Sequence, residues 1–251
     1  MHLTAAQPPS FPPLPKPPSP LRGHPSPLRT KLPGRTYSVL KVLFRSVLAM
    51  TMRWRITGME HQPPTGGYLL AVCHLNHLDP IILSAAMSRR IGWIARKEFF
   101  QHRSMRRFLL STGAFPVDRQ GYARPALREA LARLAQGEVV GIFPEGEIMS
   151  GPDSVLRGGK LRQGLAWLAL HSGKPILPVV VLGTDRLCTL DPWLPAWRGR
   201  LWLTVGAPLW APAGPADRTT RAAFTATLEA TFRQLFNETR QRHQLPETIV
   251  P

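Results

Sequence analysis

The chain has 251 residues, of which 43% are hydrophobic, enough for one sizeable α/β domain with a complete core. Its formal net charge of +17 predicts an anionic partner: nucleic acid, an anionic membrane surface or a phosphorylated substrate. Two cysteines, Cys73 and Cys188, exclude a disulfide framework, and the lack of about 18 consecutive uncharged apolar residues argues against a conventional membrane span.

The chain begins with a proline-rich segment, residues 1–34, that we expect to be disordered. Eleven of the 27 prolines lie in it, and such composition favours extended polyproline conformations over a packed fold. Residues 35–53 follow as a basic amphipathic helix, because apolar side chains recur there at helical spacing beside a narrow polar stripe. The remaining residues, 54–251, are assigned to the main domain.

The predicted helix at 35–53 precedes Glu60, the first acidic residue of the chain. Nine basic residues come before Glu60, including Lys41, Arg45, Arg53 and Arg55. A basic and largely apolar helix without acids suits the surface of an anionic bilayer. The same helix could instead pack on the protein's own core, and the sequence leaves both interpretations open.

The middle of the chain alternates between short apolar runs and helical patterns. This alternation predicts an α/β fold with a mostly parallel or mixed central sheet flanked by helices. Strands are expected at 53–57, 68–72, 91–95, 114–117, 139–143, 176–182 and 201–205. Helices are expected at 80–88, 104–111, 125–136, 161–172 and 221–242. The loops at the strand ends are then the expected location of a functional site.

Two residues in the loop after the strand at 68–72 are candidates for chemistry, His74 and Asp79. A histidine oriented by a carboxylate is the minimal unit of general-base catalysis. Five positions along a helix turn about 500°, so the pair can meet only if the loop folds back on a helix start. Asp79 as N-cap and Pro80 as the first helical residue would provide that start. Taken alone, the pair is better explained as a helix cap and an ordinary loop histidine.

Four blocks of sequence between about Trp54 and Pro208 favour a catalytic role for His74 and Asp79 over that explanation. The blocks are His74 with Asp79, Gly-Ala-Phe-Pro-Val-Asp-Arg at 113–119, Phe-Pro-Glu-Gly at 143–146, and an apolar strand with a central proline at 175–181. With these blocks in this order, the chain resembles the lysophospholipid and glycerolipid acyltransferase family, which includes 1-acylglycerol-3-phosphate acyltransferases. An Arg-Lys-Glu sequence at 96–98 also matches a Lys-Glu pair of that family.

The resemblance implies an O-acyltransferase that moves a fatty acyl group from acyl-CoA or acyl carrier protein to a lysophospholipid hydroxyl in phospholipid biosynthesis. The simplest acceptor is 1-acylglycerol-3-phosphate. His74 would be the general base and Asp79 its orienting partner, with no enzyme nucleophile. Substrate-binding residues would include Lys97, Arg119, Glu145 and Gly146. No metal, redox cofactor or nucleic acid is expected, and the protein is expected to be a peripheral, monotopic membrane protein on the cytoplasmic face.

The chain departs from the family pattern after the third block, where Glu147-Ile148 replaces the usual Thr-Arg. The family is thought to use that Arg on the phosphate of the acceptor. A carboxylate at this place would repel a phosphate unless a nearby cation, such as Arg157 or Lys160, neutralised it. The acceptor is therefore left open between lysophosphatidic acid and another lysolipid or lipid alcohol.

Two other classes of function fit parts of the sequence. His74, His77 and Asp79 form an H-x-x-H-x-D pattern of residue types that bind zinc, as in a metal-dependent hydrolase. The positive charge also suits a nucleic-acid-binding protein, although no known binding signature occurs. Cys73 could be a nucleophile, but neighbouring side chains at a strand end point apart, so we expect a packed thiol.

Overall fold

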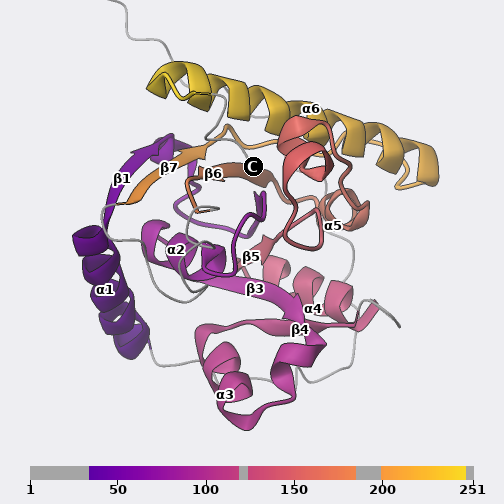
Figure 1. The fold of residues 1–251 in the computed structure, drawn as a ribbon. Helices are drawn as coiled ribbons and strands as arrows, with labels where there is room; N and C mark the ends of the chain where they lie inside the picture. Colours follow the sequence, from indigo (N-terminus) through magenta and orange to yellow (C-terminus); the bar gives the residue numbers. More distant parts are fainter. Residues whose placement is uncertain (1–33, 119–123, 185–198, 247–251) are drawn as a thin grey trace, which may run out of the picture.

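A seven-stranded sheet runs through the computed structural model, which describes residues 34–118, 124–184 and 199–246 (Figure 1). Its order is β1-β7-β6-β2-β5-β3-β4. The strands are β1 Met52–Thr57, β2 Tyr68–Val72, β3 Ile91–Arg96, β4 Phe115–Val117, β5 Val139–Ile142, β6 Ile176–Leu182 and β7 Gly199–Val205. Every strand expected from the sequence occurs, with small shifts at the ends. The predicted proline-rich tail, up to residue 33, lies outside the described residues, as does Cys188.

Five neighbouring strands, β6, β2, β5, β3 and β4, run parallel to one another. Their carboxyl ends therefore meet at one border of the sheet, which we call the carboxyl edge. β7 pairs antiparallel with β6, and β1 pairs parallel with β7, so these two strands run the opposite way. The sheet is mixed, as predicted, and the motif-bearing loops all leave it at the carboxyl edge.

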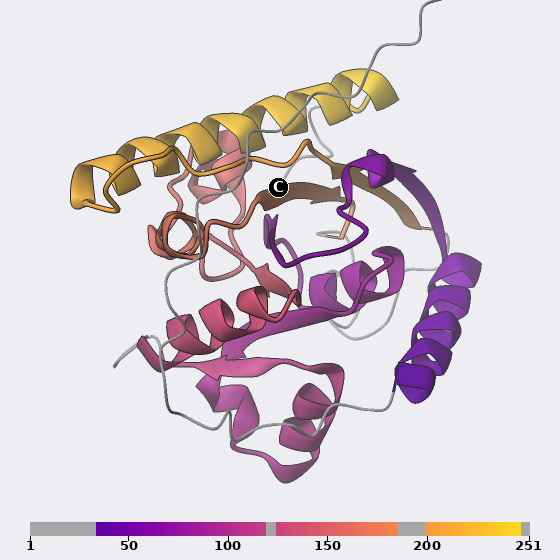
Figure 2. The same ribbon diagram turned by 180° about the vertical axis from the view of Figure 1, so that it is seen from behind.

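Helices cover both faces of the sheet (Figures 1 and 2). They are α1 Gly34–Thr51, α2 Asp79–Ala86, α3 Arg103–Thr112, α4 Arg124–Ala135, α5 Gly164–Ser172 and α6 Arg218–His243. Apolar side chains of α4, α5 and α6 share one buried cluster, while α2 and part of α1 share the other. Strand β2 contributes alternate residues to both clusters, which explains why its sequence is a continuous apolar run.

Most apolar side chains of α1 face away from the protein. The exposed ones are Val39, Val42, Leu43, Phe44, Val47 and Met50. Leu48 is buried, and the Lys41 ammonium donates hydrogen bonds to the carbonyls of Met87 and Ser88 after α2. Burial lowers the pKa of Lys41. Lys41, one of the basic residues of the predicted helix, thus caps the end of the neighbouring helix α2. Within the described residues, no helix is long and apolar enough to span a bilayer.

Gly141 of β5 lies at a crowded point beside the neighbouring strand β3. A Cβ at this position would lie 2.5 Å from the Trp93 ring and 2.6 Å from the Ile91 side chain. We therefore expect Gly141→Ala to lower the free energy of unfolding by about 1–3 kcal/mol, the usual cost of overpacking. Gly164 is the control, because nothing lies within 4 Å of its Cβ position. Urea denaturation should show a midpoint below that of wild type for Gly141→Ala and an unchanged midpoint for Gly164→Ala. Equal midpoints for the two variants would contradict the prediction.

Candidate active site

The loop between β2 and α2 brings His74 and Asp79 together at the carboxyl edge. Nδ1 of His74 lies 3.0 Å from Oδ2 of Asp79. The same carboxylate oxygen accepts hydrogen bonds from the backbone N–H groups of Leu75 and Asn76, each at 2.8 Å. Because a carboxylate accepts and does not donate, this contact places the proton on Nδ1 and leaves Nε2 of His74 able to take a proton. The loop therefore folds back on a helix start, as the spacing predicted.

Asp79 is the first residue of α2 and not its N-cap, so that expectation was wrong. Leu78 occupies the N-cap position, and Pro80 is the second helical residue. The Asp79 carboxylate turns back over the loop, where it accepts from three donors instead of capping the helix. Asn76 forms the turn: its Oδ1 accepts from the Leu78 N–H at 2.8 Å, and its Nδ2 donates to the Thr184 carbonyl at 2.9 Å. Asn76 thus ties the loop to the segment that follows β6.

Glu145 holds the backbone of His74 from the neighbouring strand end. Its Oε2 accepts the His74 N–H at 2.8 Å. Its Oε1 accepts the Val155 N–H at 2.8 Å and the Ser154 hydroxyl at 3.2 Å. Only 2% of Glu145 is exposed, and burial raises the pKa of its carboxyl although these donors oppose the shift. Both oxygens are occupied by protein donors, so Glu145 holds the loop that carries His74.

An aromatic stack holds the His74 ring in place. The Phe143 ring lies 3.9 Å from the imidazole, centroid to centroid, at an interplanar angle of 22°. Trp93 stacks on the other side of Phe143 at 4.8 Å, and its indole N–H donates to the Ser84 hydroxyl at 3.0 Å. The Met149 N–H donates to the His74 carbonyl at 3.0 Å. With its ring, N–H and carbonyl all held, His74 is fixed in one orientation before any substrate binds.

Parallel pairing of β3 and β4 brings two further motif residues to the carboxyl edge. Arg96 is in register with Val117, so Lys97 and Asp118 leave the two strands side by side. Nζ of Lys97 donates to Oδ2 of Asp118 at 2.6 Å, and this hydrogen bond raises the pKa of Lys97. Arg119, one of the predicted substrate-binding residues, follows directly but lies outside the described residues.

Residues 53–182, about half of the chain, match the model of the acyltransferase family. The chain belongs to the acyltransferase family. It is 27% identical over 164 residues to a 1-acyl-sn-glycerol-3-phosphate acyltransferase of Bacillus subtilis, covering 65% of this chain and 77% of that protein. A protein of the same name from Helicobacter pylori is 29% identical over 143 residues, covering 56% of this chain and 59% of the relative.

A solved structure has the same fold as this acyltransferase. It is PlsC, the 1-acyl-sn-glycerophosphate acyltransferase of Thermotoga maritima, with a TM-score of 0.61 and 17% sequence identity. The match covers 79% of this chain and 78% of the other. The predicted α/β architecture with a mixed central sheet is confirmed by this likeness.

Arg162 is the cation that meets the unusual Glu147 of this acyltransferase, and no sequence pattern had singled it out. Its Nε donates to the Glu145 carbonyl at 3.1 Å, and its Nη2 lies 3.4 Å from Oε1 of Glu147. The side chain crosses Gly146, where a Cβ would come within 2.3 Å of Nε of Arg162. Gly146 has a φ of +90°, so both its backbone conformation and the close approach of Arg162 favour a residue without a side chain. The contact spans the Phe-Pro-Glu-Gly turn and becomes visible only in the folded chain.

Three other residues that the sequence singled out, Lys160, His77 and Cys73, are placed differently from Arg162. Lys160 forms an ion pair with Glu229 of α6, its Nζ lying 3.1 Å from the carboxylate. His77 is exposed, and the described part of the chain contains no group of three or more His, Cys, Asp or Glu side chains that could hold a metal ion. This geometry does not support the metallohydrolase alternative. Cys73 is fully buried, and burial raises its thiol pKa well above the usual range, which agrees with a packed thiol.

Proposed function

We propose that this acyltransferase moves a fatty acyl group from acyl-CoA or acyl carrier protein to the free hydroxyl of 1-acylglycerol-3-phosphate, in phospholipid biosynthesis. The observation that carries the proposal is the His74–Asp79 pair, 3.0 Å apart and held at the carboxyl edge. The names of the relatives support the choice of acceptor. No metal or redox cofactor enters the proposed reaction.

In the proposed reaction, Nε2 of His74 takes the proton of the acceptor hydroxyl while the hydroxyl oxygen attacks the thioester carbonyl carbon. The new C–O bond forms, a tetrahedral oxyanion collapses, and the C–S bond breaks. The proton on Nε2 then passes to the departing thiolate. Asp79 stabilises the imidazolium that exists between these two transfers, and the buried Glu145 keeps the histidine backbone in place.

The phosphate of the acceptor requires positive charge near this base. We assign this role to Lys97 and Arg119, two of the predicted substrate-binding residues, and add Arg162. The side chains of Lys97 and Arg162 are 44% and 60% exposed, and each is paired with one partly exposed carboxylate. Such pairs are weak in water, so a phosphate can join or replace the carboxylate at little cost. Lys160, 82% exposed beside Glu229, is a further proposed contact.

An acceptor screen with one labelled acyl donor tests the assignment of the phosphate-binding residues. We expect 1-acylglycerol-3-phosphate to be preferred over neutral monoacylglycerol and over lysophosphatidylcholine. Arg119→Ala and Arg162→Gln should each raise the KM for it by roughly 10–100-fold, the loss of a charge-assisted hydrogen bond, with a smaller change in kcat.

The control for this screen is Arg218→Gln, which removes an exposed arginine from α6 and should leave the KM unchanged. Preference for an uncharged acceptor, or unchanged KM values in both site variants, would show that the phosphate pocket is assigned wrongly. Transfer to none of the acceptors would contradict the proposed function itself.

We also propose that the protein acts as a peripheral, monotopic protein at the cytoplasmic face of a membrane. Its proposed acceptor and product are lipids, and the apolar side of α1 is open to the surroundings. Arg45, Arg53 and Arg55 are exposed and line one hollow together with Arg200 and Arg242, where they can meet anionic headgroups. Lys41 is left out of this surface because its ammonium is bonded to the end of α2.

A further inference from the structure

Helix α3 is a second amphipathic helix whose apolar side chains are largely uncovered. None of its residues is buried. Phe108 is 42% exposed and Met105 37%, and Phe99, in the short η2 turn Lys97–Phe100 just before α3, is 45% exposed. Leu109 alone among the apolar residues of α3 packs against the core, and only partly. A surface helix normally turns such residues inward, so this side of α3 is built to meet something outside the domain.

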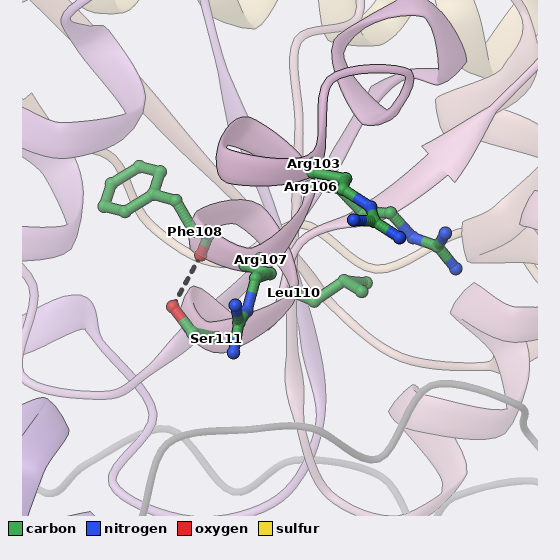
Figure 3. Close-up of a pocket in the computed structure, with 6 residues that line it drawn as sticks. All are labelled: Arg103, Arg106, Arg107, Phe108, Leu110 and Ser111. Atoms are coloured by element: carbon green, nitrogen blue, oxygen red, sulfur yellow. Dashed lines mark hydrogen bonds between the residues drawn. The ribbon is translucent and has the colours of Figure 1, made fainter.

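Arginines alternate with these apolar residues along α3. Arg103, Arg106 and Arg107 line an open hollow of about 740 Å³ together with Phe108, Leu110 and Ser111. Figure 3 shows Arg103 and Arg106 extending to the same side of the helix, with Arg107 beside Ser111. The helix contains no acidic residue, and within residues 34–118, 124–184 and 199–246 no carboxylate forms an ion pair with these arginines. The hollow is therefore strongly cationic.

Arg90 fixes the end of α3 next to the beginning of α1. Its guanidinium donates to the carbonyls of Ser111 and Thr112 and lies over the Tyr37 ring, 4.5 Å from the centroid. Both views place α3 and the first turns of α1 on the side of the molecule away from α6 (Figures 1 and 2). The start of α1 and helix α3 thus lie on one side of the domain.

We propose that α3 is a second membrane-docking helix, whose arginines bind lipid phosphates of an anionic bilayer while Phe108 and Met105 enter the headgroup region. The proposal rests on the proposed peripheral membrane function and adds the residues that dock. Interleaved arginines and apolar side chains are the composition of helices that lie in a membrane interface. An acidic carrier protein would be recognised by the charges alone and would leave the apolar residues unexplained.

Docking through α3 would also orient the site. The η2 turn follows β3 directly, so Lys97 and the start of α3 both lie at the carboxyl edge. A bilayer that contacts Phe99 and Arg103 would therefore lie close to the edge at which His74 is held. This placement lets a lipid acceptor reach the base without leaving the membrane environment completely.

Liposome flotation with a charge-matched pair of variants tests the role of the arginines. The first variant combines Arg103→Gln, Arg106→Gln and Arg107→Gln. The control combines Arg128→Gln, Arg218→Gln and Arg233→Gln on α4 and α6, which cover the other face of the sheet. On liposomes containing phosphatidylglycerol we expect the α3 variant to bind roughly 100-fold more weakly than wild type, about fivefold per arginine. The control variant should stay within about threefold of wild type, and neutral phosphatidylcholine liposomes should not separate the two.

A second variant tests the apolar residues, which the charge variant leaves in place. The double substitution Met105→Ser and Phe108→Ser should weaken binding to the same anionic liposomes. The binding that remains should be lost at a lower salt concentration than the binding of wild type. Equal flotation of wild type and the α3 arginine variant, both folded by circular dichroism, would overturn the proposal. Normal flotation with loss of binding to acyl carrier protein would overturn it too, in favour of a docking site for the donor. Flotation of His74→Ala at wild-type strength keeps this test independent of the proposed acyl transfer.

Discussion

His74→Ala is expected to lower kcat for acyl transfer by about 10²–10⁴-fold while the protein remains folded. The substitution removes the group that takes the acceptor's proton. The fold should tolerate it because Asp79 keeps its two backbone donors at 2.8 Å, so no buried carboxylate is left without a partner. Release of free thiol from acyl-CoA measures the rate, and thermal unfolding reports on the fold.

His77 provides the matched control for this experiment. It lies three positions away in the same loop, is exposed, and belongs to the H-x-x-H-x-D pattern that suggested zinc. His77→Ala should keep kcat within about threefold of wild type, since general-base catalysis needs only the histidine that faces Asp79. Wild-type activity in a folded His74→Ala protein would rule out the proposed base. Equal losses from both substitutions would point back to a metal site.

Glu145→Gln is expected to lower the free energy of unfolding by about 1–3 kcal/mol and to lower kcat as well. The two carboxylate oxygens accept from donors on opposite sides, the His74 N–H and the Val155 N–H. An amide can offer an acceptor to only one of them, so its NH₂ group must face the other donor. Either orientation displaces a segment of the site, and displacement of His74 moves the base away from its working position.

Glu147→Gln is the control for the buried carboxylate. Glu147 is 54% exposed and loses only a surface contact with Arg162, so its substitution should change stability by less than about 1 kcal/mol. Urea denaturation and steady-state kinetics on the two glutamine variants separate a buried from an exposed carboxylate. If Glu145→Gln matched Glu147→Gln in both measurements, Glu145 would not hold the loop.

The effect of Glu145→Gln should also depend on pH. Burial raises the pKa of Glu145 above its usual 4.5, so the folded state binds more protons than the unfolded state between these two values. Wild-type stability should therefore fall as the pH rises from about 4.5 through the raised pKa, because ionisation of the buried carboxyl is costly. The glutamine variant has no carboxyl to ionise at this position. The difference in free energy of unfolding between wild type and the variant should therefore shrink over that range. Urea midpoints that differ by a constant amount at every pH would contradict this explanation.

Local sequence patterns determined the helices and strands of this protein to a large extent. β2 and β6 have the bounds expected from their continuous apolar runs, because each is covered by helices on both faces. The sequence also showed how His74 and Asp79 could meet, since a loop followed by a Pro-containing helix start can fold back over only a few residues. These features depend on neighbours in the chain, and neighbours are what a single sequence records directly.

Contacts between distant segments could be learned only from the tertiary structure. The stack of Phe143 on His74 and the crossing of Gly146 by Arg162 both join residues from different segments. The helical pattern of α1 revealed an apolar side, but not that this side faces outward while Lys41 faces α2. The strand order decided the site itself, because parallel pairing of β2, β5, β3 and β4 brings four separate loops to one edge. That order depends on how whole strands pack, and no local spacing specifies it.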